Sequence, residues 1–198
     1  DNQFNNHDIY SFSMLNAKSI ITQVGQNGQP QAQRDPDACG NAWSVKNIPL
    51  VPNADAEMAA LTAFNPKSTA IIDTRYSDYL GGKTTYAPAK ARLTSYDPKY
   101  LEYSVEGGDA FIVFSELFYE GAGNDWQAYL DGEPVEHIRV NYLLRGLTVP
   151  AGKHEVVFEY APKSHFTGLK INYAGSGIIL LLLFCMGFKQ VRERTDWS

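Results

Sequence analysis

Cysteine is scarce in this sequence, which contains only Cys39 and Cys185. Two cysteines supply neither the disulfide framework of a small secreted domain nor a cysteine-rich zinc cluster. The histidines are His7, His137, His154 and His165, and they do not have the spacing of metal ligands. The sequence therefore predicts no disulfide scaffold, no metal centre and no cofactor.

Basic charge is also limited, with 17 lysines and arginines against 22 acidic residues and a net charge of −5. No basic stripe is visible, so a nucleic-acid partner is not expected. A phosphate-binding loop is missing too, because Gly121-Ala122-Gly123 is not followed by Lys-Ser or Lys-Thr.

Charge disappears completely from Ile171 to Phe188, and Ile178 to Phe188 is apolar apart from one glycine. Lys189, Arg192 and Arg194 follow at once. An apolar block of this length that ends in a basic cluster is typical of a membrane helix whose basic end faces the cytoplasm. The alternative is a buried C-terminal helix or strand of a soluble domain.

The membrane interpretation predicts the topology of the rest of the chain. Residues 1–170 would lie on the extracytoplasmic side of a bacterial inner membrane, with Tyr173 and Trp197 near its two interfaces. Cys185 would lie in the bilayer, so we expect no disulfide with Cys39. Asp1 to His7 is polar and unlike a signal peptide, so we expect upstream membrane helices in the same protein.

The first part of the chain has mixed patterns. Asn53 to Phe64 is the clearest helix, with Asn53 as its cap and Met58, Leu61 and Phe64 at helical spacing. The other expected elements are a short helix before a strand at 19–24, a loop at 25–40, a broken strand at 42–51, a strand at 69–73 and a loop at 75–87.

From residue 90 onward the apolar period is two, as in Leu101, Tyr103 and Val105. Ala110 to Leu117 is almost continuously apolar, which is typical of a strand buried on both faces. Asp131–Gly132 is a tight-turn signal between two alternating runs. We expect an α+β, mostly β fold: a jelly-roll-like antiparallel β-sandwich with a small N-terminal α/β layer and a C-terminal transmembrane helix. The expected domains are an α/β subdomain at 1–88, the sandwich at 89–168, the membrane helix at 169–190 and a cytoplasmic tail at 191–198.

A long ordered motif in the sandwich region resembles the C-terminal extracytoplasmic region of the YfhO-like bacterial membrane proteins, in their Bacteroidetes branch. It consists of Tyr119, Gly123, Trp126, Ala128, Asp131, Gly132, Arg139, Asn141, Tyr142, Arg145, Val149, Pro150, Ala151, Gly152 and His154. The segments at 11–21, 40–61 and 92–98 are similar as well, so the resemblance covers nearly the whole chain. The segment at 120–125 is longer than the compact loop usual at this place.

The resemblance implies a polytopic glycosyltransferase that takes sugars from polyprenyl-phosphate carriers and decorates envelope glycans or lipids. It also implies that the catalytic acids lie in the first extracytoplasmic loop, which this chain does not contain. No residue of this chain therefore inherits a catalytic role, and whether the chain belongs to an enzyme depends on its parent.

Acidic side chains are plentiful, and a pair of carboxylates is what glycoside hydrolysis needs. The candidates are Asp73, Asp78, Asp109, Glu116, Asp125 and Asp131. Turn chemistry is sufficient to explain Asp131, and the start of a strand explains Asp109. We therefore assign no catalytic residue in the chain.

Aromatic and polar side chains of the motif are candidate glycan contacts, because sugar faces pack on aromatic rings and hydroxyls bond to amides and charges. The candidates are Tyr119, Trp126, Tyr129, Asn141, Tyr142 and Arg145. The alternative is that Trp126 fills the core and that the tyrosines support it. Arg139 and Arg145 would then pair with Glu116 or Glu136 across strands.

Three functions remain open at this point. The first is a non-catalytic extracytoplasmic domain of a membrane glycosyltransferase, with the lipid bilayer, upstream helices and an envelope glycan or polyprenyl-linked sugar as partners. The second is a membrane-anchored carbohydrate-binding or adhesion module, and the third is a purely structural domain.

Overall fold

The computed structural model describes residues 12–24, 30–119 and 125–195. The chain divides into two compact units. The first consists of Asp1–Tyr119 and Trp126–Tyr160, and the second of Glu120–Asp125 and Ala161–Ser198. The longer loop expected at 120–125 lies outside the described residues except for Asp125, and Trp197 lies outside them as well.

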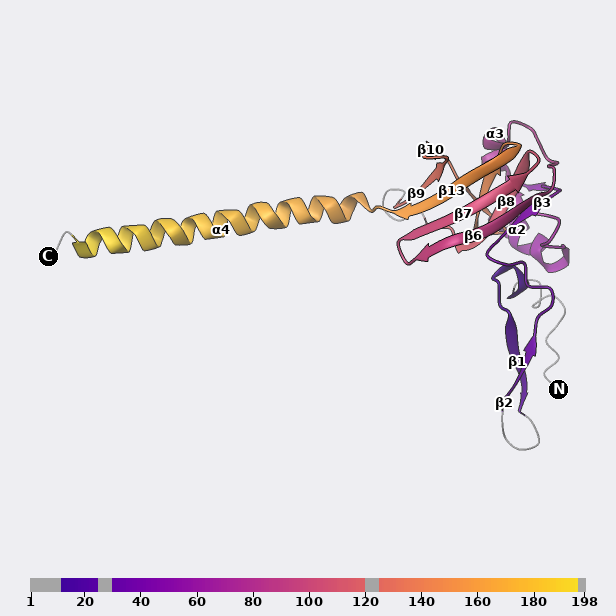
Figure 1. Cartoon of the computed structure of the whole chain (residues 1–198), viewed down its shortest axis with the longest axis horizontal. Helices are drawn as coiled ribbons and strands as arrows, with labels where there is room; N and C mark the ends of the chain where they lie inside the picture. Colours follow the sequence, from indigo (N-terminus) through magenta and orange to yellow (C-terminus); the bar gives the residue numbers. More distant parts are fainter. Residues whose placement is uncertain (1–11, 25–29, 120–124, 196–198) are drawn as a thin grey trace. The chain divides into compact units, whose positions relative to one another are not determined.

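The first unit contains the expected antiparallel β-sandwich (Figure 1). A five-stranded sheet has the order β10 (Glu133–Val135), β9 (Trp126–Leu130), β13 (Gly152–Tyr160), β7 (Tyr100–Gly107) and β6 (Ala89–Asp97). A four-stranded sheet has the order β11 (Ile138–Val140), β12 (Leu144–Val149), β8 (Ala110–Leu117) and β3 (Ala42–Val45). All neighbouring strands in both sheets are antiparallel.

The two sheets pack through a shared apolar core. Tyr103 of β7 and Phe158 of β13 face Phe114 of β8, with ring centroids 4.8 and 4.9 Å from that of Phe114. Along β7 the buried positions alternate with exposed or half-buried ones, as the period of two predicts. The core of the sandwich therefore comes from residues whose pattern is visible in the sequence.

The four-stranded sheet is covered on both faces. Ala110 to Phe114 of β8 is buried at every position, which confirms the interpretation of the first five residues of its apolar run. The end of the run differs from the expectation, since Leu117 is 61% exposed. A second apolar cluster packs on its other face and includes Trp43, Phe111 and Val113 from the sheet.

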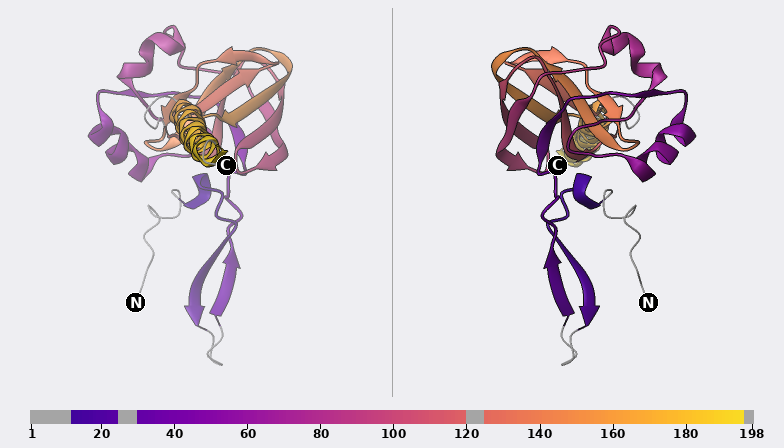
Figure 2. Two further views of the ribbon diagram at one scale, coloured as in Figure 1. Left: turned by 90° about the vertical axis from the view of Figure 1, so that its left-hand side faces the viewer. Right: turned by 90° about the vertical axis from the view of Figure 1, so that its right-hand side faces the viewer.

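That second cluster joins the sheet to the small α/β layer. The layer contains β4 (Leu50–Val51), α2 (Ala54–Ala60), η1 (Leu61–Ala63), β5 (Ile72–Asp73), η2 (Thr74–Tyr76) and α3 (Ser77–Leu80). Figure 2 shows its helices on one side of the sandwich. β4 and β5 are parallel to each other.

The helix expected from Asn53 is present, and the Asn53 side chain accepts a hydrogen bond from the Ala56 backbone amide at 2.9 Å. Its buried side differs from the expected one. Glu57 is fully buried, whereas Met58 is 47% exposed. An ion pair between Glu57 and Arg139, described below, explains why Glu57 is buried in place of Met58.

Several boundaries also differ from those expected. The segment expected as a loop at 25–40 contains β2 (Pro30–Arg34), which pairs with β1 (Ser19–Val24). β3 lies within the stretch assigned to the N-terminal subdomain, yet it pairs with β8 of the sandwich. The loop expected at 75–87 contains η2 and α3.

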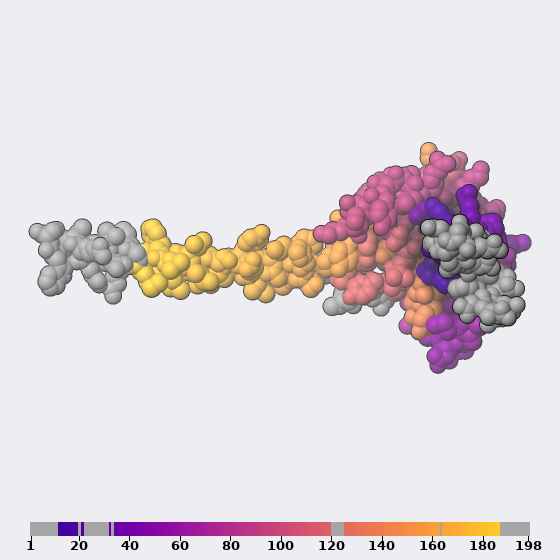
Figure 3. Space-filling model, turned by 90° about the horizontal axis from the view of Figure 1, so that it is seen from below, coloured from indigo at the N-terminus to yellow at the C-terminus, as the bar shows by residue number. Residues whose placement is uncertain are grey.

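The second unit contains α4 (Lys163–Thr195), which starts before the expected Ile171. Its stretch Ser164–Met186 is long and apolar enough to span a membrane. At about 1.5 Å per residue its 23 residues extend about 35 Å, compared with roughly 30 Å of hydrocarbon. The large apolar side chains from Ile171 to Met186 are 56–70% exposed (Figure 3).

Candidate functional site

The turn between β11 and β12 holds two of the candidate contacts, Asn141 and Tyr142. Both have positive φ angles, 48° and 71°. Asn141 is fully buried, and its side-chain oxygen accepts a hydrogen bond from the Ile71 amide at 2.8 Å. Its backbone N–H donates to the Ile71 carbonyl at 2.9 Å. Asparagine tolerates this left-handed conformation, so Asn141 fixes the turn to the α/β layer.

Glu57 anchors the same turn from α2. Its carboxylate accepts hydrogen bonds from the Tyr142 amide at 2.7 Å and from Arg139 Nη2 at 2.9 Å. Arg139 also lies over the Tyr142 ring, 5.3 Å from its centroid. Burial raises the pKa of Glu57, while the bond from Tyr142 and the charge of Arg139 oppose that rise. The expected pairing of Arg139 with Glu116 or Glu136 is therefore wrong, since its partner is Glu57.

Arg145 lies inside the sandwich and is only 2% exposed. Its Nε donates to the Leu117 carbonyl at 3.0 Å, and its guanidinium carbon lies 4.1 Å from the centroid of the Trp126 ring. Burial lowers the pKa of Arg145 to about 10, although the charge of Glu116 acts in the opposite direction. Trp126 itself is half-buried and packs against the sandwich core. The structure thus brings Trp126 and Arg145 together as a cation–π pair.

The remaining two candidate contacts are nearer the surface. Tyr119 is 58% exposed. Tyr129 is half-buried and lies opposite Val157 and Pro134 in its sheet. Because Ala128 faces the core, Tyr129 points to the outer face of the sheet. The six candidates therefore occupy several environments and do not line one common surface.

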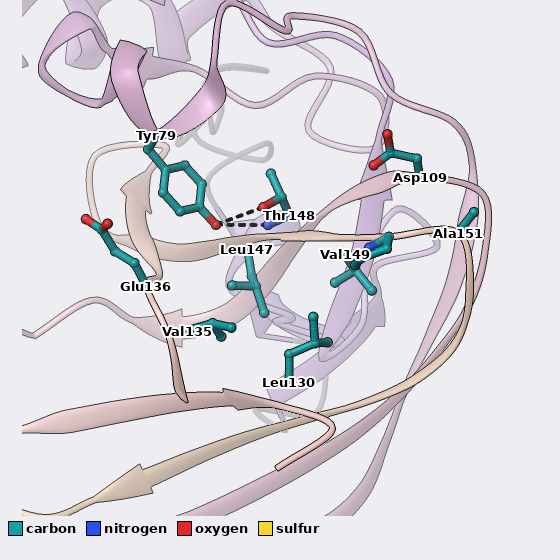
Figure 4. Close-up of a pocket in the computed structure, with 10 residues that line it drawn as sticks. Tyr79, Asp109, Leu130, Val135, Glu136, Leu147, Thr148, Val149 and Ala151 are labelled. Carbon is teal, nitrogen blue, oxygen red and sulfur yellow. Dashed lines mark hydrogen bonds between the residues drawn. The ribbon is translucent and has the colours of Figure 1, made fainter. Parts of the chain in front are cut away.

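A cavity of about 750 Å³ opens between the two sheets (Figure 4). Leu130 and Val135 line it from the five-stranded sheet, and Leu147 and Val149 line it from the four-stranded sheet. The other lining residues are Tyr79, Asp109, Glu136, Thr148, Pro150 and Ala151. Its volume is within the range of roughly 300–1,000 Å³ that is common for small-molecule sites.

Polar groups lie around these apolar walls. The Tyr79 hydroxyl accepts a hydrogen bond from the Thr148 amide at 3.1 Å and lies 3.1 Å from the Thr148 hydroxyl oxygen. Burial raises the pKa of Tyr79, so the phenol stays protonated near neutral pH. Asp109 forms an ion pair with Lys83, and Glu136 is exposed.

Two turns of the motif are joined beside the cavity. Asp131, with φ of 52°, accepts hydrogen bonds from the Glu155 amide at 2.8 Å and lies 2.6 Å from Nδ1 of His154. This contact raises the pKa of His154 and lowers that of Asp131. The expected role of Asp131 in its turn is confirmed. His154 also lies beside the Pro150–Gly152 turn as expected, since its Nε2 is 3.5 Å from the Ala151 carbonyl oxygen.

Sequence reasoning did not identify Glu57 or the cavity. A glutamate in the first turn of a helix normally faces water, so nothing marked Glu57 as buried. Tyr79 and Thr148 are 69 positions apart, and no local pattern joins them. The only available signal was Val149-Pro150-Ala151 of the motif, whose three residues line the cavity.

Among the described residues, no group of three or more histidine, cysteine, aspartate or glutamate side chains is arranged to hold a metal ion. None of the family models, curated proteins and solved structures with which the chain was compared matches it.

Proposed function

We propose that this chain is a non-catalytic, extracytoplasmic domain anchored in the bacterial inner membrane, at the C-terminal end of a polytopic YfhO-like protein. The parent protein transfers sugars from polyprenyl phosphate to envelope glycans or lipids. The single observation that carries the proposal is α4, whose stretch Ser164–Met186 is long and apolar enough to span a bilayer.

The basic residues after this stretch support the orientation. Lys189, Arg192 and Arg194 follow the apolar part of α4, and basic residues concentrate on the cytoplasmic side of membrane helices. The β-sandwich, which precedes α4 in the chain, then lies on the opposite side of the membrane.

The bonding of the acidic residues supports a role without chemistry. Asp73 bonds to Arg75, Asp109 to Lys83 and Asp131 to His154. Carboxylates with such partners stabilise the local structure, which supports a structural role for these three of the six candidate acids. The domain instead contributes by positioning an acceptor, and orientation alone is worth up to about 7–11 kcal/mol of a reaction barrier.

The test compares the parent protein with a version that lacks residues 1–160 but keeps α4. Transfer of a radiolabelled sugar from polyprenyl phosphate is measured in membranes that contain equal amounts of each protein. We expect the deletion to reduce transfer at least about tenfold, which corresponds to about 1.4 kcal/mol. The intact chain alone should show no transfer in detergent. Turnover by the isolated chain, or an unchanged rate in the deleted parent, would contradict the proposal.

The cavity favours a second function, that of a carbohydrate-binding module held by a single membrane helix. The sequence that precedes Asp1 in the gene distinguishes the two. Many hydrophobic spans support the first proposal, whereas a signal peptide directly before Asp1 supports the second.

A further inference from the structure

We infer that the cavity between the two sheets binds an uncharged or amino-sugar residue of a glycan. The inference rests on the proposed function for its biological setting, because that function brings the domain close to envelope glycans.

The walls of the cavity suit the apolar face of a sugar ring. Leu130 and Val135 from one sheet and Leu147 and Val149 from the other present hydrocarbon to the same space (Figure 4). Ligand sites are typically apolar with a few polar groups that set orientation. The C–H groups on one face of a pyranose can pack on such walls, while its hydroxyls point to the rim.

The rim offers acceptors for these hydroxyls. Glu136 lines the cavity and forms no hydrogen bond or ion pair within the described residues, so its carboxylate is available. Asp109 also lines it, and its partner Lys83 adds a donor nearby. The hydroxyl groups of Tyr79 and Thr148 lie between the carboxylates and add polar atoms that can both donate and accept.

The charge of the rim selects among sugars. Glu136 carries an unpaired negative charge, whereas Asp109 is paired with Lys83, so these three groups together carry a charge of −1. The Glu136 carboxylate attracts hydroxyls and an ammonium group and repels a phosphate or a uronic acid. A neutral hexose, an N-acetylhexosamine or a hexosamine remains.

Two contacts hold the cavity in shape before any ligand arrives. Tyr79 is bonded to Thr148, which ties α3 to β12. Asp131 is bonded to His154 and Glu155, which ties the β9–β10 turn to the start of β13. A preformed site loses less conformational entropy on binding.

The test uses the full chain in lauryldimethylamine oxide micelles, because this detergent has no sugar headgroup. Saturation-transfer NMR is recorded with methyl glucoside, methyl N-acetylglucosaminide and glucosamine, and with glucuronate as the anionic comparison. We expect transfer from the protein to at least one of the first three sugars and none to glucuronate.

Three variants then test whether the sugar binds in this cavity. Ala151→Trp, at an exposed position on the lip, should fill the cavity and abolish transfer. Glu136→Gln should weaken affinity about tenfold, since it removes a charged acceptor. Glu133→Gln is the matched control, because Glu133 is exposed on the same strand region but does not line the cavity. If circular dichroism shows that Ala151→Trp is unfolded, the comparison of Glu136→Gln with Glu133→Gln decides whether the sugar binds in the cavity.

The inference is overturned if no sugar receives transfer, if glucuronate binds as well as the neutral sugars, or if Glu136→Gln binds like Glu133→Gln. The same preparations are assayed for membrane association. A chain that stays in the membrane without binding sugar contradicts only this inference. A chain that binds sugar but is soluble without detergent contradicts only the proposed anchoring.

Discussion

The polar residues of the motif between Arg139 and Arg145 bond to partners inside the protein. Among the described residues, however, Arg139 Nε, Asn141 Nδ2 and Arg145 Nη1 are buried without a hydrogen-bond partner. Asn141 bonds to the backbone of Ile71, and Arg139 bonds to Glu57. Arg145 bonds to a carbonyl and stacks on Trp126. Burying a charge is costly unless it is paired and hydrogen-bonded, so the loss of any of these partners should destabilise the fold.

Glu57 provides the sharpest test at this scale. Glu57→Ala leaves Arg139 without its partner and the Tyr142 amide without its acceptor, so unfolding free energy should fall by about 3–5 kcal/mol. Glu57→Gln keeps an acceptor oxygen and should cost less. Asp55 is exposed on the same helix, so Asp55→Ala should change the free energy of unfolding by less than about 0.5 kcal/mol. Urea unfolding of the full chain in micelles measures the three variants, and equal stability of Glu57→Ala and Asp55→Ala would contradict this account.

At the scale of elements, local patterns predicted most of the sandwich. The alternation in β7, the apolar run at the start of β8 and the Asp131–Gly132 turn are all encoded within short windows. The pairing of β3 with β8 was not predictable, because Ala42 lies opposite Phe114 and no local signal spans that separation. The cavity was hidden for the same reason, since two sheets and α3 contribute its lining.

The bond between Asp131 and His154 makes the junction of two turns sensitive to pH. The pKa of His154 is raised in the folded state. The stability that this contact gives the fold is therefore fully present below the unfolded pKa of about 6.5, and it is lost as pH rises through the folded pKa. His137 acts in the opposite direction, because burial lowers its pKa to about 4 and the folded state therefore gains stability as pH rises past the unfolded pKa of about 6.5. This contribution is the same in the unchanged protein and in His154→Gln, so the comparison of the two isolates His154.

The melting temperature of the full chain in micelles should therefore fall more between about pH 6 and about pH 9 than that of His154→Gln. Lys153→Gln, which changes an exposed neighbour, should behave like the unchanged protein. Parallel curves for His154→Gln and the unchanged protein would show that this contact does not contribute to stability.

For the whole molecule, the central question is what covers α4. Its large apolar side chains from Ile178 to Phe184 are all more than half exposed, and the helix has no polar face along this stretch. Exposure of such a surface to water costs about 25 cal/mol of free energy for each Å² of apolar area. A bilayer satisfies all sides of the helix at once, which a protein partner on one side does not.

Partition of the full chain between membrane and soluble fractions tests this claim most directly. The chain is expressed in bacteria, and the membranes are then extracted with alkaline carbonate. We predict that the chain stays in the extracted membranes. Leu181→Arg combined with Leu182→Glu should release it, because charges at the centre of a span cost about 2.5–3.5 kcal/mol each on insertion scales. A full chain that remains soluble and monodisperse without detergent would contradict the account.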